Sequence, residues 1–213
     1  LSILAILIIC ITYLSVYGVK TDSFNNLIKN KVKEYNPKLI LEVDEVYIKL
    51  NIKESAININ TKRANLIAES NPIKISKIDI NLNLLKFLSN ENLIKNIKIK
   101  SSNNLLKDIA SFLNVVDYNL PRYILFSQIK KGLLNFEYEA KFDNSSQDII
   151  SYLISGSVKN AKLNIPGYKN LDDINFNFLV KDKKVKFSNL NFIFQNIGFL
   201  SKSLEAKEDK SGS

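Results

Sequence analysis

The chain has 213 residues, of which 46% are hydrophobic, and a formal net charge of +9. This length suffices for one sizeable domain or two small ones, and the apolar content suffices for a core, which argues against disorder over most of the chain. The sequence contains no histidine and a single cysteine, Cys10. Catalysis by a histidine base, histidine-ligated metals, a disulfide within this chain and a cysteine zinc site are therefore excluded.

The positive charge predicts an acidic partner, either nucleic acid or an anionic membrane surface. Only Arg63 and Arg122 among the 30 basic residues are arginines. Nucleic-acid surfaces usually cluster arginine with aromatic residues, because the guanidinium group binds phosphates and bases with two hydrogen bonds. The composition therefore favours a membrane and argues against nucleic acid.

Residues 1–19 contain no charged side chain and predict a transmembrane anchor. A helix of this length measures about 28 Å, close to the thickness of a bilayer's hydrocarbon core. Tyr13 and Tyr17 suit the membrane interface, and Lys20 marks the exit into water. A cleaved signal peptide and a buried helix are the alternatives, but the run is longer than the usual apolar region of a signal peptide. The lysines that follow the span would by themselves favour a cytoplasmic body.

Residues 20–37 predict a short amphipathic helix that Pro37 ends. Its apolar residues recur at intervals of three and four, as on one side of a helix. They are Phe24, Leu27, Ile28, Val32 and Tyr35. Two interpretations stay open: the flanking lysines contact lipid headgroups, or the apolar side packs on the sheet that follows.

From residue 38 to 200, apolar residues occupy every second position, which predicts a mainly β domain of short antiparallel strands. The alternation changes parity near Asp44–Glu45 and again near Ser76–Lys77, which indicates a bulge or a tight turn. Shorter strands are expected at 57–59 and 64–69, and turns at 166–167, 170–173 and 181–184. One clear helix is expected over residues 104–116 and a brief helical turn within 85–93. The charged tail, 201–213, is predicted to be disordered.

The apolar face of such a sheet must be covered, and the sequence allows two solutions. A second sheet can pack on it to form a sandwich, or a curved sheet can bind lipid chains along it. Burial stabilises both by about 25 cal/mol per Å² of apolar surface. Neither the energetics nor the periodicity chooses between them.

The segment IKISKIDINLNLLKFLSNENLIKNIKIK, residues 73–100, resembles an early repeat of the AsmA-like family, which includes TamB and YhdP. The run ISGSVKNAKLNIPGYKNLDDINFNFLVKDKKVKFSNLNFIF is similar to the repeating strand unit of that family. These motifs are degenerate apolar patterns that cover most of residues 1–200. The resemblance implies a curved, AsmA- or chorein-like antiparallel β-groove, anchored by a single span in the bacterial inner membrane. It also implies a body in the periplasm and transport of phospholipid towards the outer membrane.

A lipid-binding groove is thus the leading hypothesis, with phospholipid or another membrane lipid as partner. Its expected contacts are Ile78, Ile80, Leu82, Leu84, Ile97, Ile99, Phe136, Tyr138, Phe176, Phe178 and Phe187. Taken singly, each is an ordinary sheet-core residue, and only the set indicates a groove. The alternative is an anchored scaffold whose exposed edge strands pair with an outer-membrane or envelope assembly protein.

An enzyme is not expected. Asp172 and Asp173 are adjacent carboxylates, but neighbours on a strand point to opposite faces and suit a turn better than a metal site. Ser146 and Ser155 lack a histidine base, and the isolated glycines form no phosphate-binding loop. No cofactor and no metal site are predicted.

Overall fold

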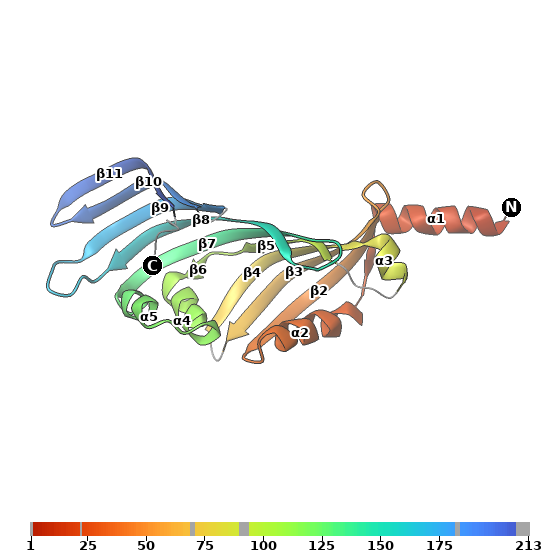
Figure 1. Ribbon diagram of the computed structural model, residues 1–213, viewed down its shortest axis with the longest axis horizontal. Coiled ribbons are helices and arrows are strands. Elements are labelled where there is room, and N and C mark those ends of the chain that lie inside the picture. The colour runs from red at the N-terminus through yellow and green to blue at the C-terminus, as the bar shows by residue number, and fades with distance from the viewer. Residues whose placement is uncertain (1, 22, 69–70, 90–93, 182–183, 208–213) are drawn as a thin grey trace.

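One antiparallel sheet contains every strand of the described chain. The computed structural model describes residues 2–21, 23–68, 71–89, 94–181 and 184–207. The strands are β1 (Val19–Lys20), β2 (Leu39–Asn51), β3 (Ala56–Ala68), β4 (Asn71–Asn83), β5 (Ile94–Ser101), β6 (Asn104–Leu105), β7 (Ile129–Phe142), β8 (Ile149–Leu163), β9 (Leu171–Lys181), β10 (Lys184–Phe194) and β11 (Ile197–Lys207). They pair in chain order, except that β5 and β6 both pair with β7 (Figure 1).

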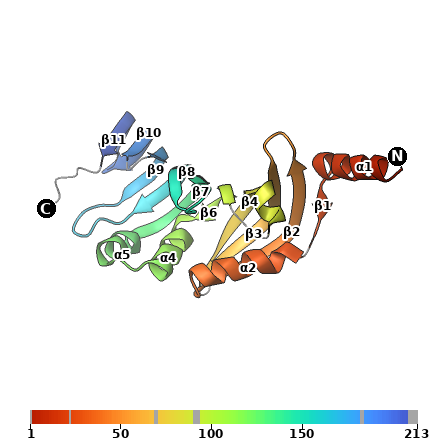
Figure 2. The same ribbon diagram turned by 45° about the vertical axis from the view of Figure 1, so that its right-hand side comes forward.

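Within the described residues, five helices accompany the sheet. They are α1 (Ser2–Val16), α2 (Ser23–Tyr35), α3 (Leu84–Leu88), α4 (Leu106–Val116) and α5 (Leu120–Ser127). Helices α2 and α4 lie along the same side of the sheet (Figures 1 and 2). Side chains from both pack against one buried cluster on that side, among them Ile28 of α2 and Ile109 of α4. The mainly β prediction is confirmed. The described strands belong to one sheet, so the sandwich alternative is wrong for this part of the chain.

Helix α1 is shorter than the predicted anchor because Gly18 ends it. The N–H groups of Tyr17 and Gly18 both bond to the carbonyl oxygen of Tyr13 at 2.9 and 3.3 Å, and Gly18 has a left-handed φ of 73°. Val19 and Lys20 then join the sheet opposite Ile48 and Tyr47. The fifteen residues of α1 measure about 22 Å at 1.5 Å per residue. In the part of the chain that the structure describes, no helix combines the length and apolar character needed to cross a bilayer.

Helix α2 packs on the sheet, which supports one of the two interpretations of residues 20–37. Ile28 is only 8% exposed and Val32 contacts the same cluster. The side chains of the other three predicted apolar positions lie outside the described residues.

The parity changes in β2, β3 and β4 lie at one level of the sheet. Val43, Ala64 and Ile75 are register partners just on one side of that level. The residue at the change is Asp44 in β2, Arg63 in β3 and Ser76 in β4, and Arg63 adopts a left-handed φ of 52°. Buried apolar residues on both sides of the change belong to one cluster. The predicted flips are therefore kinks within continuous strands that keep the apolar residues on a single face.

A second set of kinks crosses the C-terminal strands. Asn160, Asp173 and Asn189 have φ values of 51°, 49° and 53° in β8, β9 and β10. The Asn175 side chain joins neighbouring strands here, because it accepts a 2.8 Å bond from the Asn160 N–H and donates to Asn191 Oδ1 at 3.0 Å. Asparagine and aspartate tolerate this left-handed conformation better than other side-chain-bearing residues.

Four details correct the sequence prediction. The ribbons expected at 57–59 and 64–69 form one strand, β3, as far as Ala68, because the kink at Arg63 does not interrupt pairing; residue 69 lies outside the described residues. Leu171 to Asp173 lie within β9 and form no turn. Residues 201–207 of the predicted disordered tail complete β11, since their alternation matches β10. Helix α5 was not predicted, although Pro121 in its first turn is a common start signal.

Candidate functional site: the apolar face of the sheet

Rows of apolar side chains cross the sheet on the face that α2 and α4 cover in part. We call this side the apolar face. Register pairing gives one row as Ile48, Ile59, Ile80, Ile97, Ala140 and Tyr152. A second row is Val46, Thr61, Ile78, Ile99, Tyr138, Ile154, Val180, Val185 and Ala206. A third is Phe136, Gly156, Phe178, Phe187 and Leu204.

The structure brings ten of the eleven predicted contacts onto this one face. Eight lie in the three rows. Leu82 belongs to a parallel row with Leu50, Ile57 and Ile94, and Phe176 lies edge-on to Phe187 with ring centroids 5.5 Å apart.

Leu84, the remaining one, contacts the buried cluster under α2 and α4, but from a helix and not from a strand. Its alternation with Leu82 predicted a strand position, but it begins α3 because the Asn83 side chain caps that helix. Asn83 Oδ1 accepts hydrogen bonds from the Leu85 and Lys86 N–H groups at 3.1 and 3.3 Å.

The N-terminal part of the apolar face is sealed by the protein itself. Val46, Ile59, Leu82 and Ile78 are only 0%, 2%, 4% and 7% exposed. Helices α2 and α4 contribute apolar side chains to this cluster. The burial of Ile78 and Leu82 assigns these two predicted contacts to the core.

The C-terminal part of the face is more open. We call it the open strip and define it by half-buried residues of β7–β10 and exposed residues of β11. Its members are Phe136, Tyr138, Ile154, Phe176, Phe178, Val180, Val185, Phe187, Phe199 and Leu204. On β11 the exposed fraction rises to 43% for Phe199 and 50% for Leu204. Helix α4 still covers one part of the strip: Leu106 and Ile109 pack against a second buried cluster, to which Phe136, Phe176 and Phe178 of the strip also contribute contacts. The buried members of that cluster are Leu134, Val158, Ala161 and Ile174. The helices pack chiefly on β2–β7, so the strip has less helical cover towards β10 and β11.

Glycine in the third row makes room for an aromatic ring. The ring of Phe178 lies over Gly156, where an added Cβ would come within 2.6 Å of the ring and 2.3 Å of the Asn135 carbonyl oxygen. The rings of Phe176 and Phe178 are 6.4 Å apart, and Phe192 stacks on Phe199 at 5.0 Å. Aromatic side chains thus form a large part of the apolar surface of the open strip.

The opposite face of the same strands is polar and carries ion pairs. Lys98 of β5 bonds to Glu137 of β7 and lies 4.0 Å from Glu139. The hydrogen bond from Lys98 lowers the pKa of the Glu137 carboxyl group and raises the pKa of Lys98 itself. Both groups therefore stay charged at neutral pH. Because burying charged groups costs free energy, this face of the sheet stays exposed to water.

Several members of the open strip were absent from the predicted contacts, namely Ile154, Val180, Val185, Phe199 and Leu204. The first three continue the alternation of predicted strands and follow from the same signal. Leu204 was missed because residues 201–213 were assigned to the tail, and Phe199 lies within the predicted β domain but beyond the last alternating strand that the sequence identified. Comparison of this chain with protein-family models, curated proteins and solved structures found no match.

The fit of Phe178 over Gly156 can be tested by substitution. Gly156→Ala forces the new methyl group against a backbone oxygen and the ring, and we expect a loss of about 1–3 kcal/mol in the free energy of unfolding. Gly198→Ala is the matched control, because an added Cβ there has no atom within 4 Å; it should change stability by less than about 0.5 kcal/mol. Denaturant unfolding measures both, and equal effects would contradict the packing described.

Proposed function

We propose that the protein is a membrane-attached lipid-binding protein that holds acyl chains on the open strip. One observation carries the proposal: rows of apolar side chains that are sealed at β2–β4 continue across β7–β11 with less cover. Contiguous apolar surface of this kind usually marks an interaction site. Acyl chains need no directional contacts, so a surface of aliphatic and aromatic side chains suits them.

The dimensions of the open strip suit a lipid tail. From β7 to β11 the sheet has four strand intervals along the row, or about 19 Å at 4.8 Å per interval. An acyl chain in a bilayer fills half of a hydrocarbon core of about 30 Å. The strip therefore exceeds the length of one such chain.

Helix α1 provides the proposed membrane attachment. It carries no charged residue, and Leu4, Ile6 and Ile9 are 63%, 61% and 66% exposed. Figure 1 shows α1 projecting from one end of the sheet, away from the other helices. A helix with this surface gains free energy when its side chains enter hydrocarbon.

The resemblance to the AsmA-like family extends the proposal to a cellular setting. In that setting the protein sits at the bacterial inner membrane with its body in the periplasm. It carries phospholipid between inner and outer membranes, for which the open strip would be one segment of the path.

Vesicle flotation tests the membrane attachment. The full chain should float with anionic vesicles, and Ile6→Lys combined with Ile9→Lys should leave it at the bottom of the gradient, since each buried lysine costs about 3 kcal/mol. Leu179→Lys combined with Leu200→Lys, at exposed positions of β9 and β11, adds the same charge outside α1 and is the control. Undiminished flotation of the double variant would refute insertion of α1.

Adjacent residues on β9 offer a matched pair for testing lipid binding. Phe178 faces the open strip, whereas Leu179, 38% exposed, lies on the polar face. Phe178→Glu should reduce the lipid that co-purifies with the full chain about tenfold or more, because a carboxylate beside an acyl chain loses its hydration. Leu179→Glu should leave the lipid content at the wild-type level. Lipid is quantified by mass spectrometry, with unfolding curves to verify that both variants fold.

The scaffold remains a second candidate because β11 presents an open edge. Among the described residues β11 pairs only with β10, and an unpaired edge can accept a strand from another chain. The same two variants separate the candidates. A scaffold that binds through the β11 edge predicts equal lipid content in both proteins and retention of a co-purifying protein partner by both, because neither residue lies on β11.

A further inference from the structure

Two elements expose apolar side chains at the end of the sheet from which α1 projects. Leu85 and Leu88 of α3 are 70% and 72% exposed, and Ile52, in the turn between β2 and β3, is 56% exposed. The two elements are joined, because the Leu84 N–H donates a hydrogen bond to the Ser55 carbonyl oxygen at 3.0 Å. We call Ile52, Leu85 and Leu88 together the end patch.

Helix α3 is apolar on both of its sides. Leu84 and Phe87 pack against the buried cluster of the N-terminal strands. Leu85 and Leu88, three positions apart, are neighbours on the outer surface of the helix. A helix that faces water on its outer side normally carries polar residues there. The exposed leucines therefore indicate a partner with an apolar region.

The charges beside the end patch indicate which partner fits it. The described residues of 49–56 and 84–95 include four lysines and one carboxylate, Glu54. The lysines are Lys49, Lys53, Lys86 and Lys95. Lysine side chains are attracted to the negative surface potential of anionic lipids. Exposed apolar side chains next to lysines are typical of segments that lie at the boundary between headgroups and acyl chains, so the end patch fits an anionic membrane surface.

The end of α1 lies close to this patch. The Lys49 ammonium group donates a hydrogen bond to the Val16 carbonyl oxygen at 3.2 Å, three residues before Ile52. Tyr13 and Tyr17 are exposed at the same end of α1, with their rings 5.3 Å apart, and tyrosine is enriched where a membrane meets water. Figure 1 shows α3 and the β2–β3 turn at the end of the sheet from which α1 projects. Insertion of α1 up to its tyrosines therefore brings the end patch to the headgroups.

We propose that α3 and the β2–β3 turn form a second membrane contact, in which the end patch enters the headgroup region of an anionic membrane. The inference rests on the membrane attachment proposed above for α1 and goes beyond it in two respects. It assigns membrane contact to the folded body of the protein. It also orients the sheet, because the β8–β9 turn lies at the opposite ends of the strands and points away from the membrane.

Single tryptophans test the contact, because the sequence contains no tryptophan of its own. Leu88→Trp places the probe in the end patch and Tyr168→Trp places it in the β8–β9 turn, at two positions that are both 72% exposed. Each full-length variant is reconstituted in vesicles of phosphatidylglycerol and phosphatidylcholine, with or without bromine on the acyl chains near the headgroup. We expect bromine to quench the emission at position 88 about twofold, since the patch reaches the acyl-chain boundary, and to leave the emission at position 168 unchanged.

Charge reversal tests the lysines in the Leu88→Trp protein. Lys53→Glu combined with Lys86→Glu should abolish the quenching, because the patch is then repelled by phosphatidylglycerol. Lys130→Glu combined with Lys169→Glu changes the charge equally at exposed positions of the opposite end of the sheet and should retain the quenching. Quenching that survives the first pair of substitutions would contradict an anionic partner.

Flotation of the same samples separates this inference from the proposed function. Protein that floats while bromine leaves the emission at position 88 unchanged refutes the second contact and leaves the attachment by α1 standing. Emission at position 88 that is blue-shifted but not quenched assigns the end patch to a protein partner or a second copy, and also refutes the lipid contact. Protein that does not float refutes the attachment by α1 itself.

Discussion

Each long strand changes the parity of its alternation, and neighbouring strands must do so at the same level if one face is to stay apolar. A strand that slipped by one residue would turn its apolar side chains towards water. Asp44, Arg63 and Ser76 meet this requirement at one level of β2–β4. In β8–β10 the left-handed residues Asn160, Asp173 and Asn189 are offset from one another, and the register shifts beside them restore the alignment of the apolar face. The left-handed residues among them cost conformational energy, which the burial of apolar side chains beyond each kink offsets. The rows of apolar residues that define the site exist because these kinks and register shifts keep one face apolar.

The same rows serve two purposes along the sheet. At β2–β4, α2 and α4 seal them into a core that holds the N-terminal strands together. At β7–β11 the aromatic rings pack against one another and remain half-buried, with the cover decreasing towards β11. A core residue and a ligand-binding residue therefore share one sequence pattern. What separates them is the helical cover, which explains why Ile78 and Phe178 have different environments.

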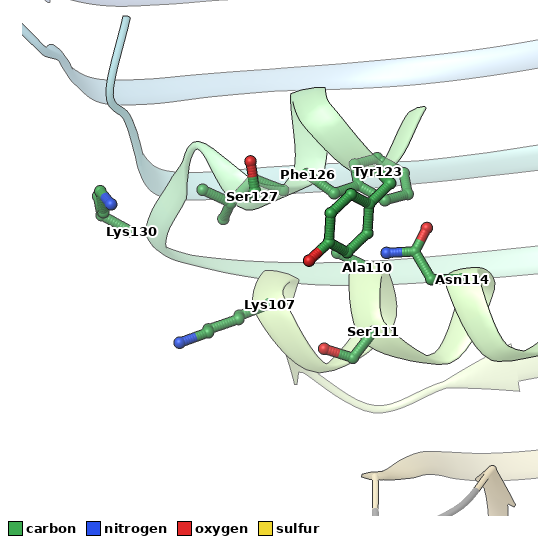
Figure 3. A pocket seen from close by; sticks show the side chains of 9 residues that line it. Lys107, Ala110, Ser111, Asn114, Tyr123, Phe126, Ser127 and Lys130 are labelled. Atoms are coloured by element: carbon green, nitrogen blue, oxygen red, sulfur yellow. The ribbon is translucent and has the colours of Figure 1, made fainter. Parts of the chain in front are cut away.

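The sequence predicts most of this sheet, since alternation identified strands from Leu39 to Phe194 and placed ten of the eleven candidate contacts on one face. Three features lay beyond that signal. Leu84 continues the alternation but begins α3, because the cap formed by Asn83 outweighs the pattern. Residues 201–207 have the charged composition of a disordered tail, and only their pairing with β10 in the structure identifies them as part of strand β11. A pocket between α4 and α5 is lined by residues of 107–130 (Figure 3), and it was not predicted because the helix α5 that forms one of its walls was not predicted.

Photocrosslinking from the open strip tests most directly whether this surface binds the acyl chains of lipids. Benzoylphenylalanine in place of Phe187 puts a reactive ketone in the third row, and it abstracts hydrogen from acyl chains within reach. Irradiation of the full chain in membranes should add a mass equal to that of a lipid, and the same group at Leu179 on the polar face should add none. Adducts of protein mass, or no adduct at position 187, would contradict the account.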